Sequence, residues 1–190
     1  MDNFKNVLES YKLSAQDIGL IKQIAIAQNI KTYKTLVDYG EKCQHIYFIL
    51  KGGFVMQLIK EDDGSERTVN FFLDNFQPFM TVPQSFFRDV PSNCKLMAIK
   101  NSDILVFPKQ KILQLAENNL SVKSFYQDQI IQALLNELDF RMKLLSLSPP
   151  KMYKLLITDY QEIIQNVSSR HIANFIGISP EWLSNLKRTL

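Results

Sequence analysis

The chain has 190 residues, which is enough for one or two domains with a buried core. Apolar residues make up 46% of it and charged residues 22%, as in ordinary globular proteins, and no run of about eighteen apolar residues indicates a membrane span. The net charge of +3 is compatible with phosphate contacts but does not by itself indicate them. The first residues carry neither a basic start nor an apolar stretch, so we expect no secretion signal and a cytoplasmic protein.

The beginning of the chain is predicted to be helical over residues 3–29. Phe4 and Leu8 belong to an apolar repeat with spacings of three and four, which is typical of an amphipathic helix. Ser14 is a suitable cap for a second helix, whose apolar face includes Ile18 and Ile21. We therefore expect two short helices before the pattern changes near residue 30.

Short strands are predicted through the middle of the chain, because apolar, β-branched and aromatic residues there alternate with turn signals. Gly40-Glu41, Lys51-Gly52-Gly53 and the run Glu61–Gly64 are the clearest of these turns. The stretch Asp74–Ser92 contains prolines and is predicted to be irregular. Strands at this spacing favour a small barrel or a double-sheet jelly roll. The predicted strands are 31–39, 46–50, 54–60, 66–73, 94–100 and 103–108.

A long helix is predicted from Ser121 to about Leu147, after a short one at 109–117. It carries an apolar row with the alternating spacings of a coiled-coil seam. This row consists of Ile131, Leu135, Leu138, Met142 and Leu145. A second apolar edge, Tyr126, Ile130 and Leu134, is expected to pack on the strands. Because apolar rows on two sides need two partners, we predict a homodimer seam, with burial of both rows in one subunit as the alternative.

Ser148-Pro149-Pro150 ends the long helix and marks a domain boundary, because the residue before a proline avoids helical angles. A supporting helix over 150–166 and two shorter helices are predicted to follow. The first of these begins at Ser168 or Ser169 and ends at Gly177. Ser179 caps the second, and Pro180 occupies its first position. Two helices joined by a short glycine-containing turn form the helix-turn-helix, which places its second helix in the DNA major groove.

The outer face of the second helix is polar, as a DNA-reading helix requires. For base contacts we favour Glu181, which can accept from a cytosine amino group, followed by Asn185 and Ser184. Capping of the helix dipole is the alternative role for Glu181. Phosphate contacts are expected from the helix ends. The predicted DNA-binding set is Ser169, Arg170, Ser179, Glu181, Ser184, Asn185, Lys187 and Arg188.

This order of elements resembles the Crp/Fnr family of bacterial transcription regulators, and most closely the short members found in Bacteroidetes. The residues that carry the resemblance are the turn Gly40-Glu41, the segment YFILKGGF at 47–54, the hairpin around Gly64, the long helix, and HIANFIGISPEWLSNLKR at 171–188. The resemblance implies a homodimer with a cyclic-nucleotide-binding-type roll. Effector binding there moves the long helix and repositions paired DNA-binding units on a near-palindromic operator, with RNA polymerase as a further partner.

The predicted fold class is therefore α+β. It comprises an N-terminal β-roll or jelly roll with flanking helices, a long dimerisation helix and a C-terminal all-α helix-turn-helix. The corresponding parts are a cyclic-nucleotide-binding-like domain at 1–120, the dimerisation helix at 121–148 and the DNA-binding domain at 149–190. The function expected is a transcription regulator that binds double-stranded DNA. The alternative is an effector-binding or protein-interaction module whose helix-turn-helix does not read DNA.

The effector region departs from the family pattern. Members that bind cyclic nucleotides use a Gly-Glu pair for the ribose and an arginine for the phosphate. No Gly-Glu pair occurs in 74–99, and Pro91-Ser92-Asn93-Cys94 places serine where the phosphate needs a cation. We therefore do not expect cyclic AMP or cyclic GMP. Another small effector and an empty roll both remain open, and the residues predicted for such a pocket are Thr81, Ser85, Arg88, Ser92 and Asn93.

Catalysis and metal binding are not predicted. The sequence has no nucleophile–base–acid set, no GxGxxG and no phosphate-binding loop, so we do not expect an enzyme and propose no cofactor. Cys43 and His45 are two residues apart, but two ligands on a strand edge do not make a metal site. Cys43 and Cys94 fit a reduced compartment, and a redox role would require a lowered thiol pKa that sequence does not show.

Overall fold

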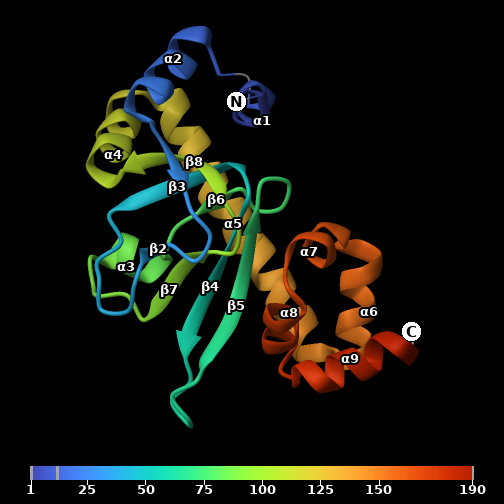
Figure 1. Ribbon diagram of the computed structural model, residues 1–190. Coiled ribbons are helices and arrows are strands. Elements are labelled where there is room, and N and C mark those ends of the chain that lie inside the picture. The colour runs from blue at the N-terminus through green and yellow to red at the C-terminus, as the bar shows by residue number, and fades with distance from the viewer. Residues whose placement is uncertain (1, 12, 190) are drawn as a thin grey trace.

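The computed structural model describes residues 2–11 and 13–189. Position 12, within the predicted helical stretch 3–29, and positions 1 and 190, the outer limits of the predicted domains, lie outside the described residues. A β-roll forms one half of the molecule and a helical unit the other (Figure 1). The long helix α5 (Leu120–Ser146) runs from one end of the roll to that unit. The α+β class predicted from the sequence is confirmed.

The roll consists of two four-stranded antiparallel sheets. The first has the order β1 (Ile26–Ile30), β8 (Ser102–Pro108), β3 (His45–Lys51) and β6 (Phe79–Met80). The second has the order β2 (Thr35–Val37), β7 (Cys94–Ala98), β4 (Gly53–Ile59) and β5 (Glu66–Leu73). Strand β5 is therefore an edge strand, which matters for the helices that cover it.

Helices cover one end of this roll and flank its sides (Figure 1). Helices α1 (Asp2–Ser10), α2 (Ala15–Ile24) and α4 (Lys109–Asn118) gather at one end together with the start of α5 (Figure 1). Helix α3 (Pro83–Arg88) lies beside the roll. The C-terminal unit contains α6 (Pro149–Asp159), α7 (Gln161–Asn166), α8 (Ser169–Ile176) and α9 (Pro180–Thr189).

Three apolar clusters hold these parts together. Phe54, Phe72 and Phe86 are among the side chains that fill the interior of the roll. A second cluster, around Phe4 and Phe48, fastens the N-terminal helices and the start of α5 to the first sheet. The third lies between the second sheet, α5 and the C-terminal helices. Burial of apolar area on this scale is the main favourable term in folding.

The prediction of helix up to residue 29 is wrong beyond Ile24. Ser14 forms the predicted cap, in a capping box with Asp17, but α2 ends at Ile24 and Ala25 is extended. Residues 26–30 instead form β1, in which Ile26 pairs with Val106 of β8. This segment is short, and its apolar residues suit either structure, so pairing with β8 decides between them.

Four other expectations also differ from the structure. The predicted strand 31–39 is reduced to β2, because Tyr33 adopts a left-handed φ of 66° and turns the chain. The irregular stretch contains α3, which begins at Pro83, and the supporting helix is interrupted at Tyr160. On α5 the expected second edge is wrong at Leu134, which is 56% exposed, while Tyr126 and Ile130 are half-buried. Phe140, which was not part of the predicted edge, is buried instead.

Candidate nucleic-acid interface

Helices α8 and α9 form the predicted helix-turn-helix from local signals. The Ser168 hydroxyl accepts from the His171 N–H at 3.4 Å, and the Ser179 hydroxyl accepts from the Trp182 N–H at 3.1 Å. Gly177 has a φ of 82°, in the left-handed region where a side chain is strained, and closes α8. Ala173 is completely buried between the helices. The other buried inner residues are Ile172, Ile176, Ile178, Leu183 and Leu186.

The predicted base-reading face of α9 is open to solvent. Glu181, Ser184 and Asn185 are exposed, whereas Leu183 and Leu186, on the inner face of the same helix, are buried. Hydrogen bonds from its own backbone N–H and from the Ser179 side chain hold the pKa of Glu181 below its ordinary value. In the free chain Glu181 therefore stabilises the start of α9, which is its alternative role, while its carboxylate stays charged and accessible.

The predicted phosphate contacts come together from two helices. Lys187, late in α9, donates from Nζ to the Ser169 hydroxyl at 2.6 Å, at the start of α8. Arg170 and Arg188 are exposed. Amino and guanidinium groups at helix ends are suitable ligands for DNA phosphates. Lys187 of α9 thus reaches the beginning of α8, where Ser169 and Arg170 lie. Sequence spacing alone does not reveal this grouping.

The helix-turn-helix docks on the roll through α8 and β5. Arg67 donates from a guanidinium nitrogen to the Phe175 carbonyl at 3.1 Å, and the Thr68 hydroxyl lies 3.4 Å from Nδ1 of His171. Beneath them Phe71 packs on Phe175 with ring centroids 4.9 Å apart. The position of α9 relative to the roll is therefore determined by contacts between residues about a hundred positions apart in sequence.

This docking is expected to weaken in mild acid. Burial, and next the charge of Arg170, lower the pKa of His171 from its ordinary value of 6.5, while Glu66 opposes this. As the pH falls through that value, the unfolded chain takes up a proton that folded His171 resists, so the free energy of unfolding decreases. Urea titrations between pH 7.5 and 5.5 should show this decrease. His171→Gln should make this decrease smaller. The remainder is expected from half-buried His45, whose pKa is also lowered by burial. If the free energy of unfolding decreased equally with pH in both proteins, His171 would not be the source of this effect.

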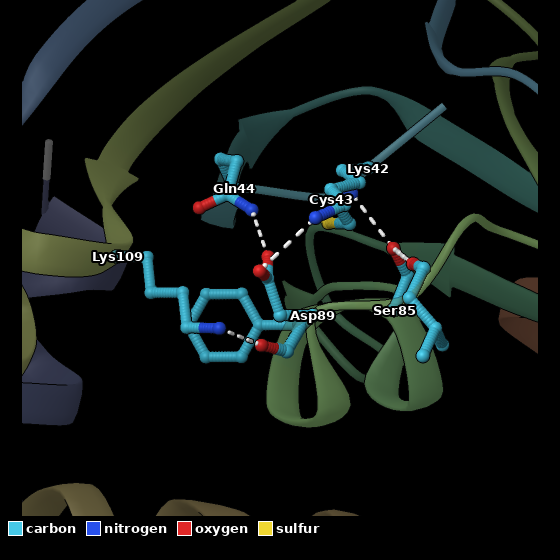
Figure 2. Close-up of polar contacts among 8 residues, drawn as sticks. Lys42, Cys43, Gln44, Ser85, Asp89 and Lys109 are labelled. Carbon is cyan, nitrogen blue, oxygen red and sulfur yellow. Dashed lines mark hydrogen bonds and ion pairs between the residues drawn. The ribbon is translucent and has the colours of Figure 1, made fainter. Parts of the chain in front are cut away.

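Helix α3 and the loop before β3 are joined by polar contacts made within the chain (Figure 2). Lys42 and Gln44 donate to the two carboxylate oxygens of Asp89 at 3.1 and 2.9 Å. The hydrogen bond from Lys42, and next that from Gln44, lower the pKa of Asp89. Lys109, at the start of α4, donates to the Phe86 carbonyl.

The residues predicted for an effector pocket are placed in different environments. Ser85 is fully buried; its hydroxyl accepts from the Cys43 N–H at 2.8 Å and donates to the Val90 carbonyl at 2.6 Å. The buried Ser92 hydroxyl donates to the Cys94 carbonyl at 2.6 Å. Thr81, half-buried, donates to the His45 carbonyl at 3.0 Å, whereas Arg88 and Asn93 are exposed.

The five residues predicted for the pocket provide no buried cationic group for a cyclic phosphate. The two buried serines already use their hydroxyls on the main chain, and the aromatic rings of Phe54, Phe72 and Phe86 occupy the interior beside them. A buried cyclic phosphate would need a cationic side chain within reach. Arg88, the one cationic residue among these five, is exposed on α3. The five pocket residues therefore remain a prediction for some other ligand.

The predicted dimer seam is exposed along α5. Leu145 is 80% exposed, and the other four seam residues, Ile131, Leu135, Leu138 and Met142, are between 44% and 62% exposed. Phe140 lies two residues after Leu138, which is about 200° around the helix axis. Its ring is buried against Phe175, Tyr160 and Phe76. One side of α5 thus holds the rest of the subunit, and the opposite side presents a free apolar row.

Within residues 2–11 and 13–189, no cluster of three or more potential metal ligands is found. None of the described helices is long and apolar enough to cross a membrane. Both cysteines are free, and burial raises the pKa of the Cys94 thiol, which disfavours its thiolate.

Comparison with known proteins relates the roll to a known domain. Residues 27–119 match the family model of the cyclic nucleotide-binding domain. The chain as a whole is similar in fold to solved structures of Crp/Fnr-type transcription regulators, which confirms the fold that the sequence resemblance implied. No curated protein sequence matches the chain.

Three solved structures illustrate this shared fold. FixK2 from Bradyrhizobium japonicum is 14% identical, with 88% of this chain and 84% of that one covered and a TM-score of 0.70. A putative Crp/Fnr regulator from Eubacterium rectale is 15% identical, with coverages of 96% and 85% and a TM-score of 0.70. CLP from Xanthomonas campestris, a c-di-GMP-responsive global regulator, is 15% identical, with coverages of 93% and 91% and a TM-score of 0.67.

Proposed function

We propose that the protein is a transcription regulator of the Crp/Fnr type that binds near-palindromic DNA as a homodimer. The observation that carries the proposal is the simultaneous exposure of two surfaces, the polar face of α9 and the apolar row of α5. Pairing of two chains through α5 leaves both α9 faces free to enter successive major grooves. RNA polymerase is the further partner that such a regulator would act upon.

In vitro selection of bound duplexes tests this function. The full chain is mixed with random double-stranded DNA at a fixed salt concentration, and bound molecules are sequenced. The expected result is a pair of inverted half-sites with a fixed centre-to-centre distance. If no duplex is enriched while the protein is folded and dimeric, the helix-turn-helix does not read DNA, and the chain is an effector-binding or protein-interaction module.

Substitutions on α9 and α8 should separate base reading from phosphate contact. Glu181→Ala and Asn185→Ala are expected to change which bases are selected, each with a loss of about 1–3 kcal/mol on the original site. Arg170→Ala should weaken specific and random duplexes alike and reduce the slope of affinity against salt by about one ion. Affinities measured at several salt concentrations distinguish the two patterns. Equal losses on specific and random duplex for all three variants would disprove the base-reading role.

We also propose that cyclic AMP does not control this regulator. The satisfied serine hydroxyls and the aromatic filling of the roll support this proposal. A stabilising ligand raises the unfolding temperature by mass action, so a screen of small molecules by thermal shift detects an effector. Cyclic AMP at millimolar concentration is expected to cause no shift, and a clear shift would overturn the proposal.

A further inference from the structure

Strand β5 has a main-chain edge that is not paired with another strand. It is the last strand of its sheet, with β4 on one side and, among the described residues, no strand on the other. Such edges expose unpaired N–H and C=O groups and are usually covered by another element. Here α8 lies along β5 and provides this cover, through its polar as well as its apolar residues.

The side chain of Asn174 pairs with this edge as a neighbouring strand would. Its Nδ2 donates to the Glu66 carbonyl at 3.0 Å, and its Oδ1 accepts from the Thr68 N–H. These two main-chain groups flank Arg67 and point to the same side of β5. A residue of a parallel strand opposite Arg67 would bond the same two groups. One amide of α8 thus takes the place of one residue of a fifth strand.

Arg67 adds a third directed contact between the strand and the helix. Its guanidinium donates to the Phe175 carbonyl, which is among the last carbonyls of α8 and has no partner within the helix. The same guanidinium lies 2.9 Å from the position that a Cβ on residue 177 would occupy. Only glycine therefore allows both the left-handed turn after α8 and this close approach of Arg67.

Directed hydrogen bonds give this interface a precision that its apolar part lacks. Apolar burial between α8 and the sheet is non-directional, so it stabilises docking without fixing one angle. Hydrogen bonds weaken steeply away from linear geometry, and two bonds from one planar amide fix both position and direction. Strand β5 is also joined to α5, because Asn70 donates to Glu137 at 3.2 Å. The helix-turn-helix and the long helix α5 are therefore both attached to strand β5.

We infer that Asn174 is a positioning residue that sets the distance between the two recognition helices of the dimer, and hence the half-site spacing of the operator. The inference rests on the proposed function. Asn174 does not touch DNA in this account. It acts by holding α8, and with it α9, at one angle to the dimer axis.

Selection with Asn174→Ala tests this inference. Alanine favours helix more than asparagine, so α8 is expected to form as before. The selected half-site bases should stay the same, but the range of accepted spacings should widen by one or more base pairs. Affinity for the original spacing should fall about tenfold, as expected for the loss of two hydrogen bonds. Gln165→Ala, which removes an exposed amide on α7, is the matched control and should change neither property.

Hydrogen exchange at the Thr68 amide gives a readout that does not depend on DNA. This N–H should exchange about tenfold faster in Asn174→Ala than in the parent or the control. Unchanged exchange would overturn the contact itself. Faster exchange with an unchanged spacing preference would show that the contact does not position the helices. If even the parent binds no duplex, the proposed function fails and the positioning role fails with it.

Discussion

Replacing Leu138 with glutamate is expected to convert the proposed dimer into a folded monomer. Leu138 is at the centre of the exposed row on α5, where two copies would meet across a two-fold axis. Two carboxylates facing each other there would be desolvated without a cationic partner, which costs several kcal/mol. Affinity for a palindromic duplex should fall about a hundredfold or more, because each half-site would then be bound independently.

Sedimentation equilibrium and duplex titration measure the two effects of Leu138→Glu. Asn136→Glu is the matched control, since it adds the same charge at an exposed position outside the row and should leave the protein dimeric. Circular dichroism should be unchanged for both, because residue 138 is not part of the subunit core. A dimer that survives Leu138→Glu would show that α5 is not the subunit interface.

Phe140→Ala is expected to cause a large loss of stability within one subunit. Its ring is 4% exposed and lies 5.3 Å from that of Phe175 and 5.1 Å from that of Tyr160. Removal of a buried phenylalanine ring costs about 3–5 kcal/mol, a large part of the roughly 5–15 kcal/mol that stabilises a typical domain. Because this ring joins α5 to the helix-turn-helix, affinity for DNA should fall as well.

Urea unfolding of Phe140→Ala provides the measurement, with Phe87→Ala as the control. Phe87 is 49% exposed on α3, so its removal should cost less than about 1 kcal/mol. A similarly small cost at Phe140 would mean that the ring is not buried between α5 and the C-terminal helices in solution.

Local signals explain why the helix-turn-helix could be predicted closely. Ser168, Gly177 and Ser179 act on backbone groups within three or four residues, so their effect can be derived without knowledge of the rest of the fold. The apolar row of α5 could be predicted for the same reason, because the spacing of its residues depends only on the geometry of a single helix. The jelly roll followed from alternating strands and turns, and it is confirmed as a class of fold.

Errors arose where distant contacts decide the structure. Residues 26–30 became a strand because β8 offered a partner, and α3 lay in a stretch where prolines suggested only irregular chain. Asn174 could not be singled out, since its partners Glu66 and Thr68 are more than a hundred residues earlier. In the sequence it is only one polar residue in a helix with otherwise apolar neighbours.

Footprinting of the full chain on its selected duplex tests the central claim most directly. Hydroxyl radicals cleave the DNA backbone wherever protein does not cover it. The account predicts two symmetrical protected regions whose centres are about 34 Å apart, one helical turn, as expected for two α9 helices in successive major grooves. Protection of a single region, or none at concentrations where the dimer is intact, would contradict it.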